Sequence, residues 1–497
     1  MRIVQRTRNY PDLRELAIVA SLACLTVLIA FAAQGYGWLW ATVAFVLVPS
    51  LLVIFPAVIT QIGRLLAAAR DQVSWWHVLW VLLFLSDLTF RIRTAGDIER
   101  DAVDSWAAYR ISLVSIAGAI LLFRLGLRGA GWIGSLFRGL VGALALYALI
   151  CAISTVWSVY PAWTFYKSFE YMVDVAFLAA ILVSAKSERE WRALFNWNYA
   201  LQVILVGSAW LGALIWPQEA FTHSRGIFTA QLTGVLPMVP SNGLGEMGAI
   251  LAVVSLGRLA GRTEKTASAR VMLVLLFVTG LATTILSQTR SAALGLFVGS
   301  VLVLFFARRK KLLLALVLTG LFLFALTSVG SLGEEFLRRG QTDEQVQGLS
   351  GRVGYWTFGW QQYLKHPFTG LGAYTARFTV LDKLGEGETS SIHNSYMEVL
   401  IGVGPIGLVP LLVALFGTWR IAIRFLRSMA SVAIDHPLAV DCIGLLAVIT
   451  VRSFFTIEMI WHPPLLFMVV LGYAEFLRRQ DLQPRTLRYR QAVDGNV

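Results

Sequence analysis

The residues that could do chemistry in this sequence are a histidine and two arginines. His393 stands immediately before a long apolar run, where its imidazole could accept a proton from a hydroxyl group near neutral pH or, when charged, pair with phosphate. Arg225 lies in HSRGIF, in a stretch with no acidic residue between Glu219 and Glu246. Arg290 lies in SQTRSAALG, where the chain turns between two apolar runs. Guanidinium groups bind phosphate through paired hydrogen bonds, so we expect both arginines to bind an anionic ligand.

The position of His393 depends on the helix that follows it. Ser395 and Glu398 form S-x-x-E ahead of the apolar run, a capping-box pattern that starts the helix at Ser395. His393 then precedes a helix N-terminus, where unpaired backbone N–H groups collect anions. The simpler alternative is a histidine that only satisfies a loop carbonyl group. For the two arginines the simpler alternative is snorkelling to the lipid headgroups.

The apolar run itself contains G-x-G-x-x-G, at Gly402, Gly404 and Gly407. This pattern binds dinucleotides only where it joins a strand to a helix in a βαβ unit, and no polar stretch of this chain is long enough for a Rossmann domain. We therefore expect the three glycines to let neighbouring helices approach closely. Pro405 would interrupt the helical hydrogen bonds at a place where packing compensates.

The composition places these residues in a membrane protein. Hydrophobic residues make up 57% of the 497 residues and charged residues 14%, against roughly 25% charged in soluble domains. Apolar runs of sufficient length predict an all-α polytopic membrane protein with about 12 to 14 transmembrane helices. The runs lie near residues 16–33, 38–59, 75–90, 111–127, 140–157, 171–185, 197–216, 244–259, 271–287, 291–306, 312–330, 395–418, 438–455 and 463–477. The first run could alternatively be a signal peptide, with Ala30-Phe31-Ala32 as its cleavage site.

The distribution of basic residues predicts the orientation. With the N-terminus in the cytoplasm, the inner segments hold 28 of the 42 Lys and Arg residues, so we expect both termini in the cytoplasm. The net charge of +13 follows from this bias and gives no reason to expect nucleic-acid binding. Cys24, Cys151 and Cys442 lie in apolar runs and support neither disulfides nor a metal cluster. Because the chain has no D-x-D motif and no cluster of metal ligands, we expect no metal and no cofactor.

The longest polar stretch, residues 331–394, is expected on the outer side of the membrane. It is too short for an independent catalytic domain and long for a loop without function. Within it, GRVGYWTFGWQQYLKHP predicts a short amphipathic helix that lies in the membrane interface. The residues at helical spacing are Val353, Trp356, Trp360 and Tyr363. This helix could merely rest on lipid, or it could wall a cleft into which Arg352 points.

Five short motifs occur in one order along residues 225–410. His393-Asn394, nine residues and then Gly404-x-x-Gly407 form H-N-x9-G-x-x-G. The other motifs are Arg225-Gly-x-Phe228, Asn242-Gly-Leu-Gly245, Thr289-Arg290-Ser291, and Gly351-Arg352 followed by Trp356. This set resembles the O-antigen ligase and polymerase family, whose members join sugars to lipid-linked glycans. The stretch QLTGVLPMVPS makes the distance between the first two motifs longer than in the family's pattern.

The resemblance implies a substrate and a mechanism. The donor would be an oligosaccharide on undecaprenyl pyrophosphate at the periplasmic face of the bacterial inner membrane, and its transfer would be metal-independent and inverting. Arg225 and Arg290 would hold the pyrophosphate and stabilise it as it leaves, whereas His393 would act as base on the acceptor hydroxyl or orient the phosphate. Arg352 and Asn394 would be further substrate-binding residues. The partners would be the lipid-linked donor, a glycan or lipid-linked acceptor, the bilayer and envelope polysaccharide export proteins, but no nucleic acid.

Three regions follow from the spans and motifs. Residues 1–224 are expected to form N-terminal transmembrane helices, residues 225–418 the catalytic region with the periplasmic loop 331–394, and residues 419–497 further helices with a basic cytoplasmic tail. The favoured function is polymerisation of surface or exopolysaccharide repeat units, since the G-R-x-x-x-W loop resembles that branch of the family. The alternatives are an O-antigen ligase that transfers finished glycan to lipid A-core or to a protein, a flippase for lipid-linked oligosaccharides, and a structural partner of an export complex.

Overall fold

The structure of the chain is a computed structural model. The residues that it describes are 74–88, 104–127, 132–185, 187–223, 230–261, 266–325, 352–384, 391–428, 437–457, 459–460 and 465–481. The first two predicted spans, near residues 16–33 and 38–59, lie outside these residues.

Each of the other twelve predicted spans coincides with a helix. These helices are α3 (Trp75–Asp87), α5 (Ser105–Leu127), α7 (Gly139–Ile153), α8 (Pro161–Ser184), α9 (Glu188–Ile215), α11 (Ser241–Gly261), α12 (Ala267–Leu286), α13 (Arg290–Phe306), α14 (Lys310–Ala325), α18 (Ser395–Ser428), α19 (Pro437–Ser453) and α20 (Leu465–Asp481). The shorter helical elements are α6 (Ile133–Leu136), η2 (Ser154–Val156), α10 (Pro217–Ala220), α17 (Arg352–Lys365), η3 (Arg377–Leu381) and η4 (Asp382–Leu384). An antiparallel hairpin of β1 (Phe221–His223) and β2 (Ala230–Leu232) departs from the all-helical expectation.

The long helices have the length and surface of membrane spans. Within the described residues six are long and apolar enough to cross a membrane, namely α5, α7, α9, α11, α12 and α18, and the apolar helices α3 and α13 are shorter. Large apolar side chains point outward from these helices, and Leu122, Phe123 and Phe416 are each more than 60% exposed. Such a surface suits lipid rather than water. The chain is therefore a mostly helical, multi-pass membrane protein.

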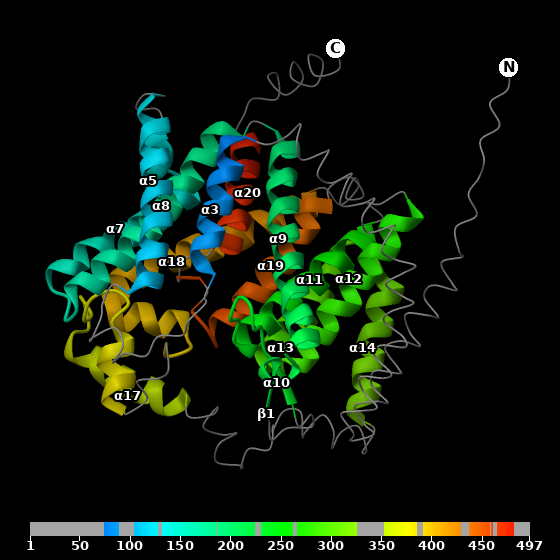
Figure 1. Ribbon diagram of the computed structural model, residues 1–497. Coiled ribbons are helices and arrows are strands. Elements are labelled where there is room, and N and C mark those ends of the chain that lie inside the picture. The colour runs from blue at the N-terminus through cyan, green and yellow to red at the C-terminus, as the bar shows by residue number, and fades with distance from the viewer. Residues whose placement is uncertain are drawn as a thin grey trace.

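The helices pack in two connected groups. Helix α11 packs against α9, α12, α13 and α19, whereas α18 packs against α7, α19 and α20. In Figure 1 the α11 group lies to the right, α5, α7 and α8 lie to the left, and α18 and α20 lie between them. Helix α17 and the β-hairpin both lie at the lower end of the bundle in this view. We call this the hairpin end, and α11, α13 and α18 begin there while α19 ends there.

Two glycines allow α11 and α12 to pack closely. A Cβ atom added to Gly248 would meet the carbonyl oxygen of Gly280 at 2.7 Å, and one added to Gly280 would meet the carbonyl oxygen of Gly248 at 2.6 Å. Small residues permit this approach of helix backbones within a membrane. The close packing that the sequence predicted for the G-x-G-x-x-G segment therefore occurs at another pair of glycines.

Helix α18 is kinked at Gly404. This residue has φ 65° and ψ −167°, a conformation that is essentially restricted to glycine. Pro405 follows it and has no N–H, so the carbonyl of Ile401 loses its helical donor. The backbone N–H of Leu371 replaces that donor at 2.9 Å, and the next N–H of the loop donates to the next carbonyl of the helix at 2.8 Å. The kink thus exposes backbone carbonyls that a loop then satisfies.

Two glycines of G-x-G-x-x-G, Gly402 and Gly404, pack against this loop rather than against a neighbouring helix, which corrects the sequence prediction. A Cβ atom on Gly402 would meet backbone atoms of Ala373, and one on Gly404 would meet the carbonyl of Phe368. A Cβ atom on Gly407 would meet side chains of α18 itself. The prediction expected helix packing because sequence spacing does not show which segment approaches a glycine.

Helix α17 confirms the predicted amphipathic helix, but only part of the predicted outward face. Val353 and Trp360 are 40% and 46% exposed, and Leu364 joins them at 56%. Trp356 and Tyr363 are partly buried, and Tyr363 packs against a small buried cluster of the neighbouring loop. The exposed stripe therefore comprises Val353, Trp360 and Leu364, and its contact with lipid stays a prediction.

Candidate active site

The turn between α12 and α13 places Arg290 at the hairpin end. Helix α12 ends at Leu286 and α13 begins at Arg290, which is partly buried, so the predicted tight turn is confirmed. Thr289 Oγ1 donates to the carbonyl of Ser241 at 3.1 Å. A Cβ atom on Gly245 would collide with Thr289, which explains why this position of α11 needs a residue without a side chain. The N-G-L-G motif at the start of α11 and the T-R-S motif at the start of α13 therefore pack against each other.

The hairpin that carries Arg225 is fixed to the same turn. Arg225 itself lies in the tip between β1 and β2, outside the described residues. Below the tip, Gln231 Nε2 donates to the carbonyl of Ser287 at 2.6 Å. In return, Gln288 Nε2 donates to the carbonyl of Ala230 at 3.1 Å. These reciprocal amide bonds tie the hairpin to the turn that precedes α13.

The lengthening stretch QLTGVLPMVPS forms part of this anchor. It contributes most of β2 and then a tight turn in which Gly234 and Val239 exchange backbone hydrogen bonds of 2.8 and 3.1 Å. Its last residue, Ser241, is also the first residue of α11. The added residues therefore hold the hairpin against α11 instead of separating the two.

Asn394, and not Ser395, caps α18. The Asn394 Oδ1 atom accepts hydrogen bonds from the backbone N–H groups of Tyr396 and Met397, each at 3.0 Å. Ser395 instead donates its hydroxyl proton to the carbonyl of Thr456 at 2.8 Å. The predicted capping box at Ser395 is therefore wrong, because asparagine one residue earlier provides the acceptor and the serine is drawn to the end of α19. The proposed role of Asn394 in substrate binding stays a prediction, and its amide oxygen is already used by the helix.

His393 has an unusual backbone and a perturbed imidazole. Its φ is 54°, and its backbone N–H donates to Ser391 Oγ at 3.3 Å. Burial lowers the pKa of the His393 imidazole to about 3, and the positive charges of Arg352 and Arg452 lower the pKa further. The imidazole is therefore neutral at pH 7 and has a lone pair that can accept a proton. Arg352 therefore lies within electrostatic range of His393, and its role in substrate binding stays a prediction.

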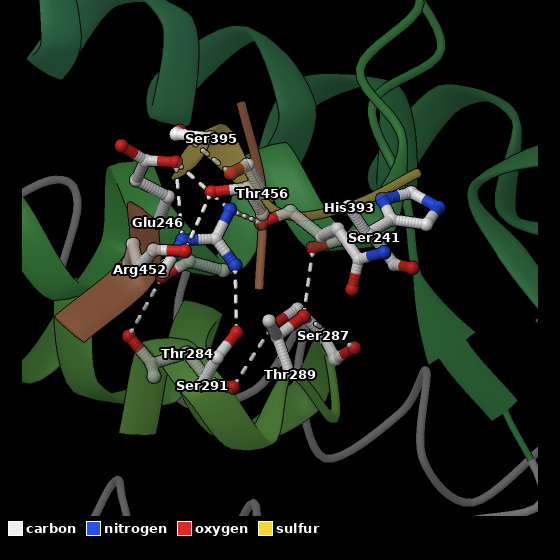
Figure 2. Close-up of polar contacts among 12 residues, drawn as sticks. Ser241, Glu246, Thr284, Ser287, Thr289, Ser291, His393, Ser395, Arg452 and Thr456 are labelled. Atoms are coloured by element: carbon white, nitrogen blue, oxygen red, sulfur yellow. Dashed lines mark hydrogen bonds and ion pairs between the residues drawn. The ribbon is translucent and has the colours of Figure 1, made fainter. Parts of the chain in front are cut away.

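Arg452 is a buried cation of the site that the sequence-based prediction did not select. It is completely buried and pairs with Glu246 through Nη2 at 2.8 Å and Nε at 3.2 Å. It also donates to Ser291 Oγ at 2.9 Å and to the carbonyl of Asn242 at 3.1 Å. Figure 2 shows this pair among hydroxyl groups, with His393 to one side. An arginine inside an apolar run is a functional candidate by default, and this signal could have identified Arg452.

Residues 275–412 match a protein-family model described as O-antigen ligase. The chain carries an O-antigen ligase domain. It is accordingly a membrane enzyme of the glycosyltransferase type, and its chemistry is lipid-linked glycan transfer of the ligase or polymerase kind. No curated protein matches the chain.

The O-antigen ligase domain contains most of the predicted site. Arg290, Arg352, His393 and Asn394 lie inside its bounds, and Arg225 lies before it. The buried Arg452 and its partner Glu246 also lie outside the O-antigen ligase domain, after its end and before its start. Within the described residues no group of three His, Cys, Asp or Glu side chains could hold a metal ion. Arg452 nevertheless donates to Ser291 Oγ, which lies within the bounds of the O-antigen ligase domain.

Proposed function

We propose that the chain polymerises polysaccharide repeat units by transferring a growing oligosaccharide from undecaprenyl pyrophosphate at the periplasmic face. The observation that carries this proposal is the place of His393, which lies directly before the N-terminus of α18 and within the O-antigen ligase domain. Burial and the charges of Arg352 and Arg452 lower the pKa of its imidazole, so the ring is neutral at pH 7. A neutral imidazole can take a proton from an acceptor hydroxyl, and a guanidinium group can hold a phosphate. Both lie in or beside an O-antigen ligase domain.

The proposed step is a single displacement. The acceptor hydroxyl loses its proton to the imidazole of His393 as its oxygen attacks the anomeric carbon of the donor sugar. The bond from that carbon to the pyrophosphate oxygen breaks, and the lipid pyrophosphate leaves with the electron pair. Because attack comes from the face opposite the leaving group, the anomeric configuration inverts. Arg290 and Arg225 stabilise the charge on the leaving pyrophosphate, which removes the need for a metal ion.

The low pKa of His393 fits a base that becomes active only with substrate. In the free chain, burial and two arginines make the imidazole a weak base. A bound pyrophosphate brings negative charge to the same place and stabilises the protonated imidazole. The pKa of His393 therefore rises when the donor binds, so that the base gains strength at the moment when a proton must be taken.

The transfer assay tests this proposal directly. The purified chain in proteoliposomes receives a synthetic single repeat unit on undecaprenyl pyrophosphate, and the products are separated by length. We expect a ladder of polymer that survives EDTA and that His393→Ala reduces by about 10²- to 10⁴-fold, the usual contribution of a general base. His366→Ala is the matched control because His366 is exposed in the same polar region. Near-normal polymer from His393→Ala would remove the base from the proposal.

Polymerase and ligase differ in what accumulates when the enzyme is lost. A polymerase lengthens the lipid-linked glycan, so a deletion strain should hold only single repeats on the lipid carrier. A ligase acts once on a finished chain, so its loss would leave long chains on the carrier. The G-R-x-x-x-W spacing at Arg352 and Trp356 supports the polymerase. Mass spectrometry of the lipid-linked glycans distinguishes the two, and accumulated polymer would favour the ligase.

A further inference from the structure

Two side chains lie at the backbone polar groups of Ile392, the residue before His393. The indole Nε1 of Trp356 donates to the carbonyl of Ile392 at 3.0 Å. From the other side, the carboxylate of Glu398 faces the backbone N–H of Ile392 and that of Ala376. Glu398 and Ile392 are buried. The carbonyl of Ile392 is therefore bonded to α17, and the carboxylate in the first turn of α18 lies close to its N–H group.

Helix α17 carries both the tryptophan that bonds to Ile392 and an arginine whose charge acts on His393. Arg352 and Trp356 are four residues apart, so they lie on one face of the helix. Arg352 acts on the imidazole of His393 through its charge, and Trp356 acts on the backbone just before it through a hydrogen bond. One helical turn of α17 therefore supplies both a cation at the site and a support for the histidine.

The backbone of His393 requires such support. Its φ of 54° is uncommon for a residue with a side chain, and such conformations persist only where the surroundings hold them. The hydrogen bond from the N–H of His393 to Ser391 Oγ is long, at 3.3 Å, and does little to stabilise this backbone conformation. On the residues that flank His393, Asn394 is held by its cap on α18, and the carbonyl of Ile392 is held by Trp356.

We propose that Trp356 and Glu398 are positioning residues that hold His393 in place by gripping Ile392 from both sides. Neither residue is proposed to touch a reacting atom. The inference rests on the proposed function of His393 as base, and it adds the reason why an arginine and a tryptophan occur four residues apart in α17. A shift of α17 would therefore move Arg352 and His393 together.

The test compares two tryptophans on one helix. Trp356→Phe keeps an aromatic ring and removes the N–H donor, and Trp360→Phe makes the same change at an exposed position of α17. The readout besides polymer formation is carbethoxylation of His393 by diethylpyrocarbonate, followed by peptide mass spectrometry from pH 5.5 to 7.5. The reagent modifies neutral imidazole. In the wild-type chain and in Trp360→Phe, the rate at His393 should change little across this range.

Trp356→Phe should make the rate at His393 pH-dependent. The loosened imidazole moves out of its partly buried place and away from the charges of Arg352 and Arg452, so its pKa returns toward about 6.5. Its neutral fraction then falls by about tenfold between pH 7.5 and 5.5. Polymer formation should fall with it. Glu398→Met, which removes the second grip without opening a large cavity, should produce the same change. His366 provides the internal standard for a histidine that already lies in solvent.

The outcomes separate the two proposals. If either variant is folded, as judged by a monodisperse peak in detergent, and its His393 rate stays flat with pH, the grip on Ile392 does not position His393 and the inference is overturned. If the rate becomes pH-dependent while His393→Ala still forms polymer, the positioning holds and the role of His393 as base fails. A pH-dependent rate together with inactive His393→Ala supports both.

Discussion

At the scale of single residues, the proposed function predicts that the site needs guanidinium groups rather than positive charge alone. Arg290 is partly buried at the first turn of α13, where the Thr289 and Gly245 contact fixes its backbone. A planar guanidinium can make two parallel hydrogen bonds to a phosphate, and an ammonium group cannot. The identity of the side chain at position 290 should therefore matter even when its charge is kept.

We expect Arg290→Lys to lower polymer formation by about 10- to 100-fold, since a hydrogen bond to a charged group contributes about 1.5–3 kcal/mol. The same change at Arg225 should have a comparable effect, because the sequence assigns it the same ligand. Arg308→Lys is the control, since Arg308 is exposed just beyond the other end of α13. The measurement is the initial rate of the proteoliposome assay. Full activity in both site variants would favour snorkelling arginines.

At the scale of elements, the kink of α18 joins the helix to the loop before it. The kink needs φ 65° at position 404, and the loop needs the space that the missing side chain leaves. We expect Gly404→Ala to lower the stability of the folded chain by about 1–3 kcal/mol through backbone strain alone. Thermal unfolding in detergent measures this, with Gly207→Ala in α9 as control because nothing lies within 4 Å of its added Cβ. Equal melting temperatures for the two variants would contradict the kink's role.

Two ion pairs of opposite polarity join α11 and α19. At the hairpin end Glu246 of α11 meets Arg452 of α19, and toward the other end Arg258 of α11 meets Asp441 of α19 at 3.2 Å. Each helix therefore carries both signs, and only one antiparallel register satisfies both pairs. The two pairs fix the alignment of α11 with α19, and with it the contact of Arg452 with Ser291 next to Arg290.

A double-mutant cycle tests the pair at the hairpin end. Removing one partner leaves the other charge buried and unpaired, which costs about 3–5 kcal/mol, whereas removing both charges costs much less. We expect Glu246→Leu and Arg452→Met each to reduce the melting temperature and the amount of inserted protein, and the double variant to recover part of both. Purely additive losses would show that the two side chains do not depend on each other.

At the scale of the whole molecule, the charge bias predicts which end of the bundle faces the periplasm. The bias places α17 outside and the segment between α13 and α14 inside. Single cysteines at Lys365 and Lys310, both exposed, should report this when intact cells meet an impermeant thiol reagent. Labelling is expected at position 365 only, and Cys151 and Cys442 should stay silent because they are buried. Labelling at position 310 instead would invert the topology and place the site in the cytoplasm.

The sequence identified candidate site residues, but it did not identify the residues that they contact. His393 and Arg290 were selected from sequence because a titratable or cationic group in or beside an apolar run is costly and conspicuous. Arg352 was selected because it begins the amphipathic helix and matches the G-R-x-x-x-W motif. Glu246 was noticed only as a distant carboxylate, and its partner Arg452 lies 206 positions later in the chain. No local pattern links two such residues. The prediction of the cap on α18 was wrong for a related reason, because Ser395 matches the capping pattern but donates its hydroxyl to the carbonyl of Thr456.

The sequence by itself determined the class of the molecule and its helices, because runs of apolar residues of membrane length have no other stable state and backbone hydrogen bonds within lipid must be local. It also determined that Arg290 follows a tight turn, since two apolar runs leave only three residues between α12 and α13. Only the tertiary structure decided which loop packs against the kink at Gly404 and which carboxylate pairs with Arg452. It also decided that Trp356 turns inward and donates to the carbonyl of Ile392. Those contacts join segments far apart in the chain, and their energies depend on distances that folding creates and that sequence spacing does not contain.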